Sequence, residues 1–384
     1  MIISNANKQV ACEKHRTLLE LIYTFGNKVM LMKQLYEYAQ VIGVAKNYST
    51  FCNSVKELIN ADILRKESFN AFKRKSQLQM LIIRKYGIRF VEGKTDSYSV
   101  ASVKKAHGNE RILISIFKNQ YILNKIIPRI QKASMKVTLG AITELLERDQ
   151  STVLYNKNQG LSALLKMRNR ATLQKHLDMS SIDQDIEKLQ KIKRRMEEGL
   201  KKGSKASEWK GRGRLRPSEK SSVNRVGNVT GRNRDLSKEE KIDNYTLDTM
   251  LAFNAYIAQI RADQSQIKIT ALVFDIHNRS DIYKIATQIA CMFHMFDRYF
   301  KDKFELKVGI VSIDEFASNH LKTQAESAAI DFVSKERKGT RLSNLLESWR
   351  VKTTMQEQIK VRFVDYNITN EFLDGVKHAN LIRR

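Results

Sequence analysis

Acidic residues near the ends of an apolar segment are the residues whose type and spacing could support catalysis. Asp275 lies near the end of the apolar segment 267–276, Asp263 precedes that segment, and His277 follows it. Metal-dependent nucleases place carboxylates around such a strand to bind Mg²⁺ and activate water, with a lysine two residues after the second carboxylate. Here that position is His277, a poor Mg²⁺ ligand. A non-catalytic protein is therefore expected, and a Mg²⁺-dependent nuclease is the alternative hypothesis.

The sequence carries no recognisable motif for a resident metal or cofactor. Cys12, Cys52 and Cys291 lie far apart, and an odd number of cysteines argues against a disulfide framework. Cys291 and His294 share the apolar face of a predicted helix, where buried packing is expected rather than metal binding. No Walker sequence or dinucleotide fingerprint occurs, which argues against an ATPase. We expect no cofactor, with Mg²⁺ needed only by a nuclease.

The chain of 384 residues is strongly basic, with 68 Lys and Arg against 41 Asp and Glu and a formal net charge of +27. A fold does not need this imbalance, which speeds encounter with polyanions such as nucleic acid. An anionic membrane surface or a lysine-rich proteome would also explain it. No stretch near 20 apolar residues occurs, and the N-terminus does not resemble a signal peptide. We expect a cytoplasmic protein that does not enter a membrane.

Three short helical patterns followed by a basic hairpin dominate the first hundred residues. Apolar residues recur at helical spacing, and two short apolar runs beyond them have the composition of strands. This order is typical of a winged helix-turn-helix, which we predict for residues 1–104 and which usually binds DNA. The helical segments are 13–25, 32–42 and 49–60, and the strands are 63–66 and 77–84.

The last of these helical segments has an apolar face formed by Phe51, Val55, Leu58 and Ile59. Its other face then points outward, where Asn, Ser and Thr can contact base edges and Lys can reach guanine or phosphate. Backbone N–H groups at the helix N-terminus favour a phosphate, and a basic hairpin tip suits phosphates or the minor groove. The predicted DNA-binding residues are Asn47, Tyr48, Ser49, Thr50, Asn53, Ser54, Lys56, Lys73, Arg74 and Lys75.

A largely helical region is predicted for residues 105–200 and a basic linker for residues 201–240. Within the first, 181–196 is amphipathic and begins with a plausible capping box of Ser181 and Gln184. It could form a coiled-coil arm, but packing on a neighbouring domain is the favoured interpretation. The linker has 12 basic and 5 acidic residues and few apolar ones, so we expect it to be flexible. It either binds phosphates non-specifically or acts as a solvated tether.

An α/β domain is predicted for residues 241–384. A helix is expected at 245–260 and another helical region at 316–335. Apolar segments at 267–276, 306–313 and 359–364 have the composition of buried strands, and 281–300 that of a long helix between the first two. A strand–helix–strand order implies parallel pairing, because the connecting helix crosses over the sheet.

The same domain contains the segment Phe274-Asp275-Ile276-His277-Asn278-Arg279, then a long helix, then Val308-Gly309-Ile310-Val311. This arrangement resembles the replication-relaxation family of Gram-positive plasmids and conjugative elements, in which an apolar strand ends in an acidic-x-acidic pattern followed by Arg-Gly. The resemblance covers residues 15–100 and 265–365. It implies a winged helix joined to a restriction-nuclease-like domain and a DNA-associated role on a mobile element. Because His277 replaces the second acidic residue, it does not imply catalysis.

The sequence thus predicts a mixed α and α/β fold, with an N-terminal winged helix-turn-helix, a helical middle region and a mostly parallel C-terminal sheet. The predicted function is sequence-specific binding of double-stranded DNA in replication, transfer or transcription control. A homodimer on repeated half-sites is compatible with this function. The alternatives are a nuclease using Asp263, Asp275 and His277, and a scaffold whose winged helix binds protein.

Overall fold

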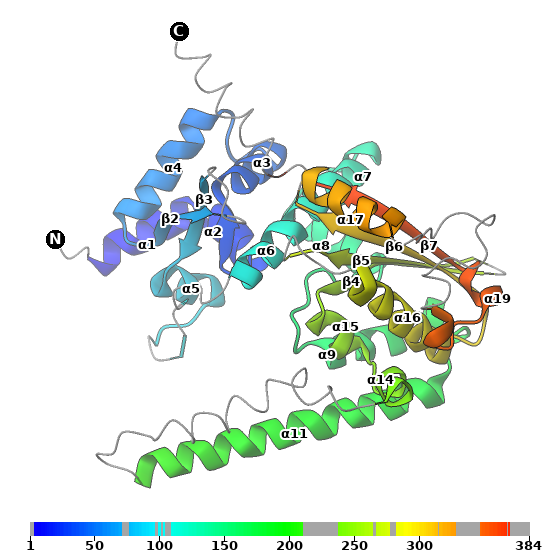
Figure 1. Cartoon of the computed structure of the whole chain (residues 1–384). Coiled ribbons are helices and arrows are strands. Elements are labelled where there is room, and N and C mark those ends of the chain that lie inside the picture. The colour runs from blue at the N-terminus through cyan, green and yellow to red at the C-terminus, as the bar shows by residue number, and fades with distance from the viewer. Residues whose placement is uncertain are drawn as a thin grey trace.

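The structure is a computed structural model of the chain, in which helices join and surround two sheets (Figure 1). Within the residues described, the fold is mixed α/β with a mostly parallel sheet in the C-terminal part. None of the helices there combines the length and apolar character that crossing a bilayer requires. The described residues are 4–70, 77–96, 99–100, 103, 109–209, 237–263, 266–276, 282–313, 315–327, 346–366 and 368.

The N-terminal elements surround a three-stranded antiparallel sheet in which β3 lies between β1 and β2. The helices predicted at 32–42 and 49–60 are confirmed as α3 and α4. Gly43 ends α3 with a positive φ of 84°, a conformation that glycine adopts without steric cost. The elements are α1 (Asn5–Lys14), α2 (Arg16–Thr24), β1 (Val29–Leu31), α3 (Met32–Ile42), α4 (Tyr48–Asn60), β2 (Leu64–Asn70), β3 (Gln77–Ile83) and α5 (Lys85–Glu92).

Some of these elements are absent from the sequence prediction. The helix predicted at 13–25 corresponds to α2, which begins only at Arg16 because the backbone departs from helical geometry at His15 (φ −117°, ψ 27°). The helix α1, which ends at Lys14, was not predicted. The strand β1 has three residues, too few to show a period of two. Nothing was predicted for α5, which follows β3 directly and packs against α2.

A long helix then connects the two sheets. It consists of α6 (Asn109–Tyr121), a π-helical turn η2 (Ile122–Ile126) and α7 (Ile127–Lys132). A proline usually ends or kinks a helix, but this helix continues past Pro128. Pro128 lies in the first turn of α7, directly after the π-helical turn, where the altered hydrogen-bond pattern accommodates a residue without an N–H group.

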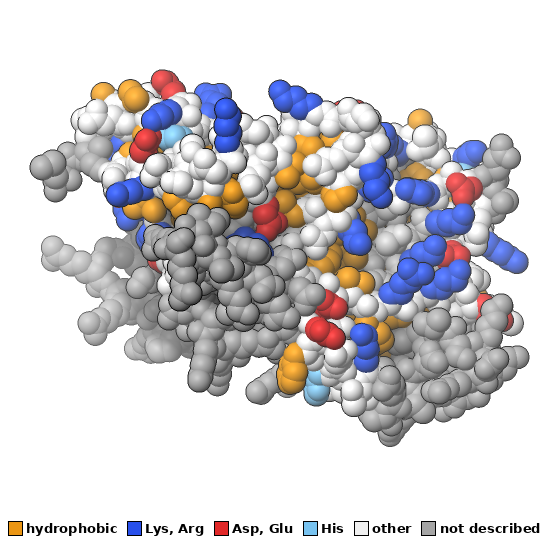
Figure 2. Space-filling model, turned by 90° about the horizontal axis from the view of Figure 1, so that it is seen from above, with side chains coloured by type: hydrophobic (Ala, Val, Ile, Leu, Met, Phe, Trp, Pro, Cys, Tyr) orange, Lys and Arg blue, Asp and Glu red, His pale blue; other side chains and the backbone are white. Residues whose placement is uncertain are grey.

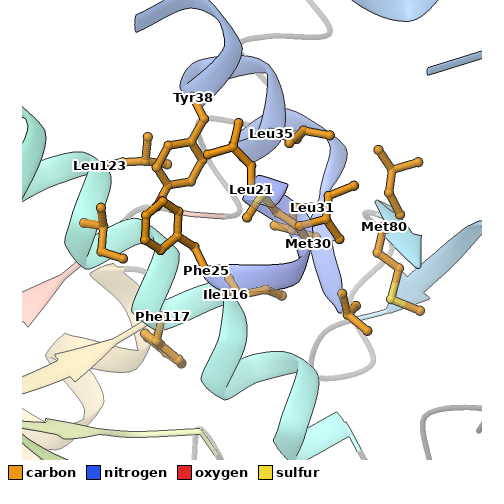
Figure 3. Close-up of a cluster of buried hydrophobic side chains, with 14 of the residues drawn as sticks. Leu21, Phe25, Met30, Leu31, Leu35, Tyr38, Met80, Ile116, Phe117 and Leu123 are labelled. Atoms are coloured by element: carbon orange, nitrogen blue, oxygen red, sulfur yellow. The ribbon is translucent and has the colours of Figure 1, made fainter. Parts of the chain in front are cut away.

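The helix α6 belongs to the same hydrophobic core as the N-terminal elements (Figure 3). Ile116 and Phe117 of α6 belong to this cluster. Within it, Phe25 at the end of α2 and Tyr38 of α3 stack with their ring centroids 5.6 Å apart. Buried polar contacts accompany this packing: Gln34 donates to the carbonyl oxygen of Ile116 at 2.9 Å. The N-terminal elements are therefore joined to α6 by a continuous core rather than by an exposed connection.

The C-terminal sheet has the order β4-β5-β6-β7. β4 is antiparallel to β5, whereas β5, β6 and β7 are parallel, as predicted from the crossover helix between the first two. The helix α16 makes this crossover and α17 contacts β6 and β7. The elements are α14 (Lys238–Asp243), α15 (Leu247–Ala252), β4 (Ala255–Ala262), β5 (Ile267–Phe274), α16 (Ile282–Tyr299), β6 (Phe304–Ser312), α17 (Glu315–Ser327), α19 (Thr353–Gln356) and β7 (Ile359–Asp365).

The prediction of a helix over 245–260 is wrong for its second half. The helix α15 ends at Ala252, Asn254 takes a positive φ of 59°, and the chain then continues as β4. The apolar run that begins at Ala255 is compatible with either a buried helix or a buried strand. Pairing with β5 decides for the strand, since Tyr256 lies opposite Leu272 and Ile260 opposite Ile269.

The remaining helices divide between the two cores. α8 (Leu139–Arg148) packs with α7, whereas α9 (Gly160–Arg168), α10 (Ala171–Gln174) and α11 (Met179–Trp209) pack with the C-terminal elements. The segment 181–196 is expected to pack on a neighbouring domain. This is confirmed, because Ile182, Ile186 and Leu189 are buried in the C-terminal core.

The amino-terminal end of α11 differs from the predicted capping box. Asp178, not Ser181, caps the helix: its carboxylate accepts from the backbone N–H of Ser180 at 3.1 Å and from the hydroxyl of Ser181 at 2.9 Å. The helix also extends to Trp209, so residues 201–209 of the predicted linker are helical. Residues 210–236 of that prediction lie outside the described residues, and its last three residues are also helical, because α14 begins at Lys238.

A lysine is buried where α6 meets the C-terminal sheet. Lys118 is 5% exposed, donates to the carbonyl oxygen of Tyr155 at 2.6 Å and lies over the ring of Tyr256 at 4.5 Å. Burial lowers the pKa of Lys118 to about 7 from an ordinary value of 10.5. Between these values the unfolded chain binds a proton that the folded chain has released. Folding stability must therefore increase as the pH rises through this window.

Replacing Lys118 with methionine tests this coupling. In the native chain Lys118 should add up to about 1.4 kcal/mol per pH unit to the free energy of unfolding between pH 7 and 10. The Lys118→Met variant should lose this increase, and Lys125→Met, which changes an exposed lysine of the same helix, should keep it. Urea unfolding at pH 7, 8 and 9 measures the slopes. An unchanged slope in Lys118→Met would contradict the assignment.

Candidate nucleic-acid interface

The helix α4 presents two distinct faces, as its spacing predicts. Phe51, Val55 and Leu58 are buried in the N-terminal core. The opposite face is polar. Exposed on it are Ser49, Thr50, Asn53 and Lys56, whereas Ser54 is half-buried and donates to the carbonyl oxygen of Thr50 at 3.2 Å.

The first turn of α4 is shaped by Asn47. Its side-chain oxygen accepts from the backbone N–H of Thr50 at 2.8 Å and from the Thr50 hydroxyl at 2.9 Å. This N-cap occupies one of the backbone donors that could otherwise bind a phosphate. Asn47 thus has a structural role in addition to the DNA contact predicted for it.

Tyr48 stands at the exposed start of the same helix. The residue is 46% exposed, and its ring meets the ring of Tyr36 edge-on with the centroids 5.1 Å apart. The pKa of Tyr48 is raised to about 12, mainly because the rest of the side chain is buried and, to a smaller extent, because of the neighbouring Cys52. The phenol therefore stays protonated at neutral pH and can donate a hydrogen bond to an anionic oxygen.

Ion pairs that the sequence pattern did not reveal hold the carboxyl-terminal half of α4. The carboxylate of Glu57 lies 2.8 Å from Nζ of Lys14 and 2.8 Å from Nε2 of His15. The hydrogen bond from Lys14, then that from His15, lowers the pKa of Glu57 below its ordinary value. These partners come from α1 and from the residue between α1 and α2, about 40 residues away in the sequence. They fix the end of α4 without using its outward polar face.

The basic hairpin tip lies between two paired strands. β2 and β3 are antiparallel, and their last described pair is Asn70 with Gln77. The predicted contacts Lys73, Arg74 and Lys75 belong to the connection between these two residues and lie outside the described residues.

The carboxylates of the nuclease hypothesis are not brought together. Asp263 lies at the turn between β4 and β5, where it pairs with Lys268 at 2.9 Å, and that contact lowers its pKa. Asp275 lies beyond the other end of β5, is 2% exposed, and donates its backbone N–H to the carbonyl oxygen of Val311. The strand β5 has eight residues, which corresponds to a length of about 26 Å. One Mg²⁺ therefore cannot contact both carboxylates.

Among the described residues, the other candidates for metal chemistry form no site either. His277 lies outside the described residues. Cys291 is buried, and Nε2 of His294 lies 2.6 Å from the carbonyl oxygen of Trp349, so this pair belongs to the core, as predicted. Within the described part of the chain, no group of three or more His, Cys, Asp or Glu side chains is arranged to hold a metal ion.

No family model, curated protein or solved structure matches this chain. No residue role can therefore be carried over from a relative.

The N-cap of α4 makes a testable contribution to stability. Asn47→Ala removes the acceptor for the Thr50 N–H and should lower the free energy of unfolding by about 1 kcal/mol. Asn47→Asp keeps an acceptor at the same place and should retain most of that energy. Urea unfolding of both variants measures the difference, and equal destabilisation by Ala and Asp would show that the cap contributes nothing.

Proposed function

We propose that this chain binds double-stranded DNA sequence-specifically and that its N-terminal elements act as a winged helix-turn-helix. The element order supports this assignment: two helices, α3 and α4, follow the short strand β1 and precede the hairpin of β2 and β3. In such a domain the second helix of the turn motif enters the major groove. Here that helix is α4.

The outward face of α4 is the observation that carries the proposal. Asn53 is exposed one turn after Ser49 and Thr50, and Lys56 follows it on the same side. An amide side chain can form two hydrogen bonds with adenine, and hydroxyls can contact any base edge. This polar face is not needed for folding, because the core of the domain is built from the opposite side of the helix.

The charge of the chain supports a polyanionic partner. The formal net charge is +27, and Lys56 on α4 forms no ion pair among the described residues. The hairpin tip adds Lys73, Arg74 and Lys75, which we assign to phosphates or to the minor groove. We further propose that the protein acts on a plasmid or related mobile element, in replication, transfer or transcription control, as the family resemblance implies.

Asn53→Ala tests base recognition. Selection from a random duplex library should give one preferred sequence for the native chain, and the variant should lose preference at one base position, by about 1–3 kcal/mol. Asn60→Ala is the matched control, since Asn60 is exposed on the same helix but two turns further on. The same preference in Asn53→Ala would remove Asn53 from the interface. No enriched sequence with the native chain would refute sequence-specific binding.

Neutralising Lys73, Arg74 and Lys75 together with glutamine tests the hairpin tip. Binding to all duplex sequences should weaken by a similar factor, because phosphates are the same everywhere. The slope of log Kobs against log[salt] should become shallower by about 0.9 for each phosphate that the variant no longer neutralises. Fluorescence anisotropy with a specific and a random duplex over a salt series measures both quantities. Unchanged slopes would place the hairpin away from the DNA.

A further inference from the structure

One face of the C-terminal sheet is only partly covered. The opposite face packs throughout its length against α16 and its neighbours. On the partly covered face, α6 lies over the carboxyl-terminal ends of the strands, where Phe117 stacks on Phe274 at 5.3 Å and Val311 joins the same core. Nearer the strand starts, no apolar layer formed by described residues lies over the sheet. Side chains alternate along a strand, so this uncovered area is formed by Arg261, Lys268, Thr270, Lys307, Gly309, Lys360 and Arg362, with Glu305 on the same face opposite Lys268.

The strand register places these basic side chains next to one another on adjacent strands. Lys268 of β5 lies opposite Arg261 of β4, and Lys307 of β6 lies opposite Lys360 of β7. Adjacent strands are about 4.8 Å apart, so the cations stand side by side. The side chains of Lys268, Lys307 and Lys360 are 42%, 46% and 56% exposed. Seen from above, Lys and Arg side chains gather over the part of the molecule remote from the N-terminal elements (Figure 2).

Like charges directly opposite each other destabilise a sheet, and only part of this repulsion is offset. Two acids provide this offset: Asp263 lies 2.9 Å from Lys268, and Glu305 lies 3.0 Å from Lys307 and 2.9 Å from Lys360. Arg261 and Arg362 are exposed and form no ion pair among the described residues. The area therefore keeps an excess of positive charge that folding does not require and that an anionic partner would neutralise.

We propose that this uncovered basic area, the basic sheet face, binds the phosphate backbone of duplex DNA as a second contact beside α4. The inference rests on the proposed function. The long, flexible Lys and Arg side chains of this face, with the small residues Thr270 and Gly309 between them, can reach the evenly spaced phosphates of a DNA strand. A protein partner would need apolar or aromatic anchors, and lysine is depleted at such interfaces. The large exposed apolar side chains of the described residues belong to other segments of the chain.

Charge-neutral variants test the basic sheet face. In K307Q/K360Q/R362Q, affinity for specific and random duplexes should fall by the same factor. The salt dependence of log Kobs should become shallower by about 0.9 for each phosphate left without its cation, with the preferred sequence unchanged. Because this variant leaves Glu305 without its partners, R261Q/R362Q serves as a second variant that keeps both ion pairs and should show a smaller change of the same kind.

K191Q/K193Q/R194Q is the matched control. It removes the same number of lysines and arginines from the exposed side of α11, which runs along the bottom of the molecule in Figure 1, beyond the layer of α9, α15 and α16. Its salt slope should equal that of the native chain. An equal loss of slope in this control would show an effect of net charge alone and would overturn the inference.

The outcomes separate this inference from the proposed function. If the native chain selects a sequence through Asn53 but neither sheet variant changes the salt slope, the basic sheet face is not a DNA surface and the inference falls alone. If the sheet variants lose affinity while Asn53→Ala and the hairpin variant behave as the native chain, the inference stands and the role of α4 falls. If the native chain does not bind duplex DNA at moderate salt, both fall, and an acidic protein becomes the partner to seek.

Discussion

The packing of α6 against the turn that precedes β1 is the constraint on which the rest of the structure depends. In this turn a Cβ atom on Gly26 would lie 2.6 Å from the carbonyl oxygen of Val29, so only glycine fits. Ser115 Oγ of α6 lies within hydrogen-bond distance of the carbonyl oxygens of Gly26 and Val29, at 2.8 and 3.0 Å. The helix α6 thus supplies a hydrogen-bond donor to the carbonyl groups of this buried turn. The geometry of the turn also sets where β1 and α3 begin.

The other side of α6 fixes the second half of the molecule. Phe117 stacks on Phe274 of β5, and the neighbouring Lys118 is bound at Tyr155. One helix therefore contacts the N-terminal elements and the C-terminal sheet through a common core. As a consequence, α4 and the basic sheet face have a defined relation to each other. Two DNA contacts on such a frame would bind without the entropy cost of ordering a flexible connection.

The sequence was sufficient for elements whose pattern is long and local. α4 and α16 show helical periodicity over several turns, and the parallel pairing of β5 and β6 follows from the crossover helix between them. It was insufficient where long-range pairing decides. β4 is apolar enough for a helix and becomes a strand only because β5 lies beside it. For the same reason, the separation of Asp263 from Asp275 by the whole length of β5 was not visible in their spacing along the chain.

Composition indicated a polyanionic partner but not the surface that would bind it. Many cations are committed to carboxylates, as Lys14 is to Glu57 and Arg129 to Asp149, and these contribute little to attracting DNA. The two proposed contact surfaces differ from such pairs. The outward face of α4 has Lys56 without an ion pair among the described residues, and the basic sheet face has more basic side chains than acidic ones in contact with them. This local excess of positive charge depends on which residues the fold places next to each other. On the basic sheet face, the register of β6 and β7 determines the excess more than the total number of lysines does. The charge of the chain becomes informative about function only after each ion pair has been assigned.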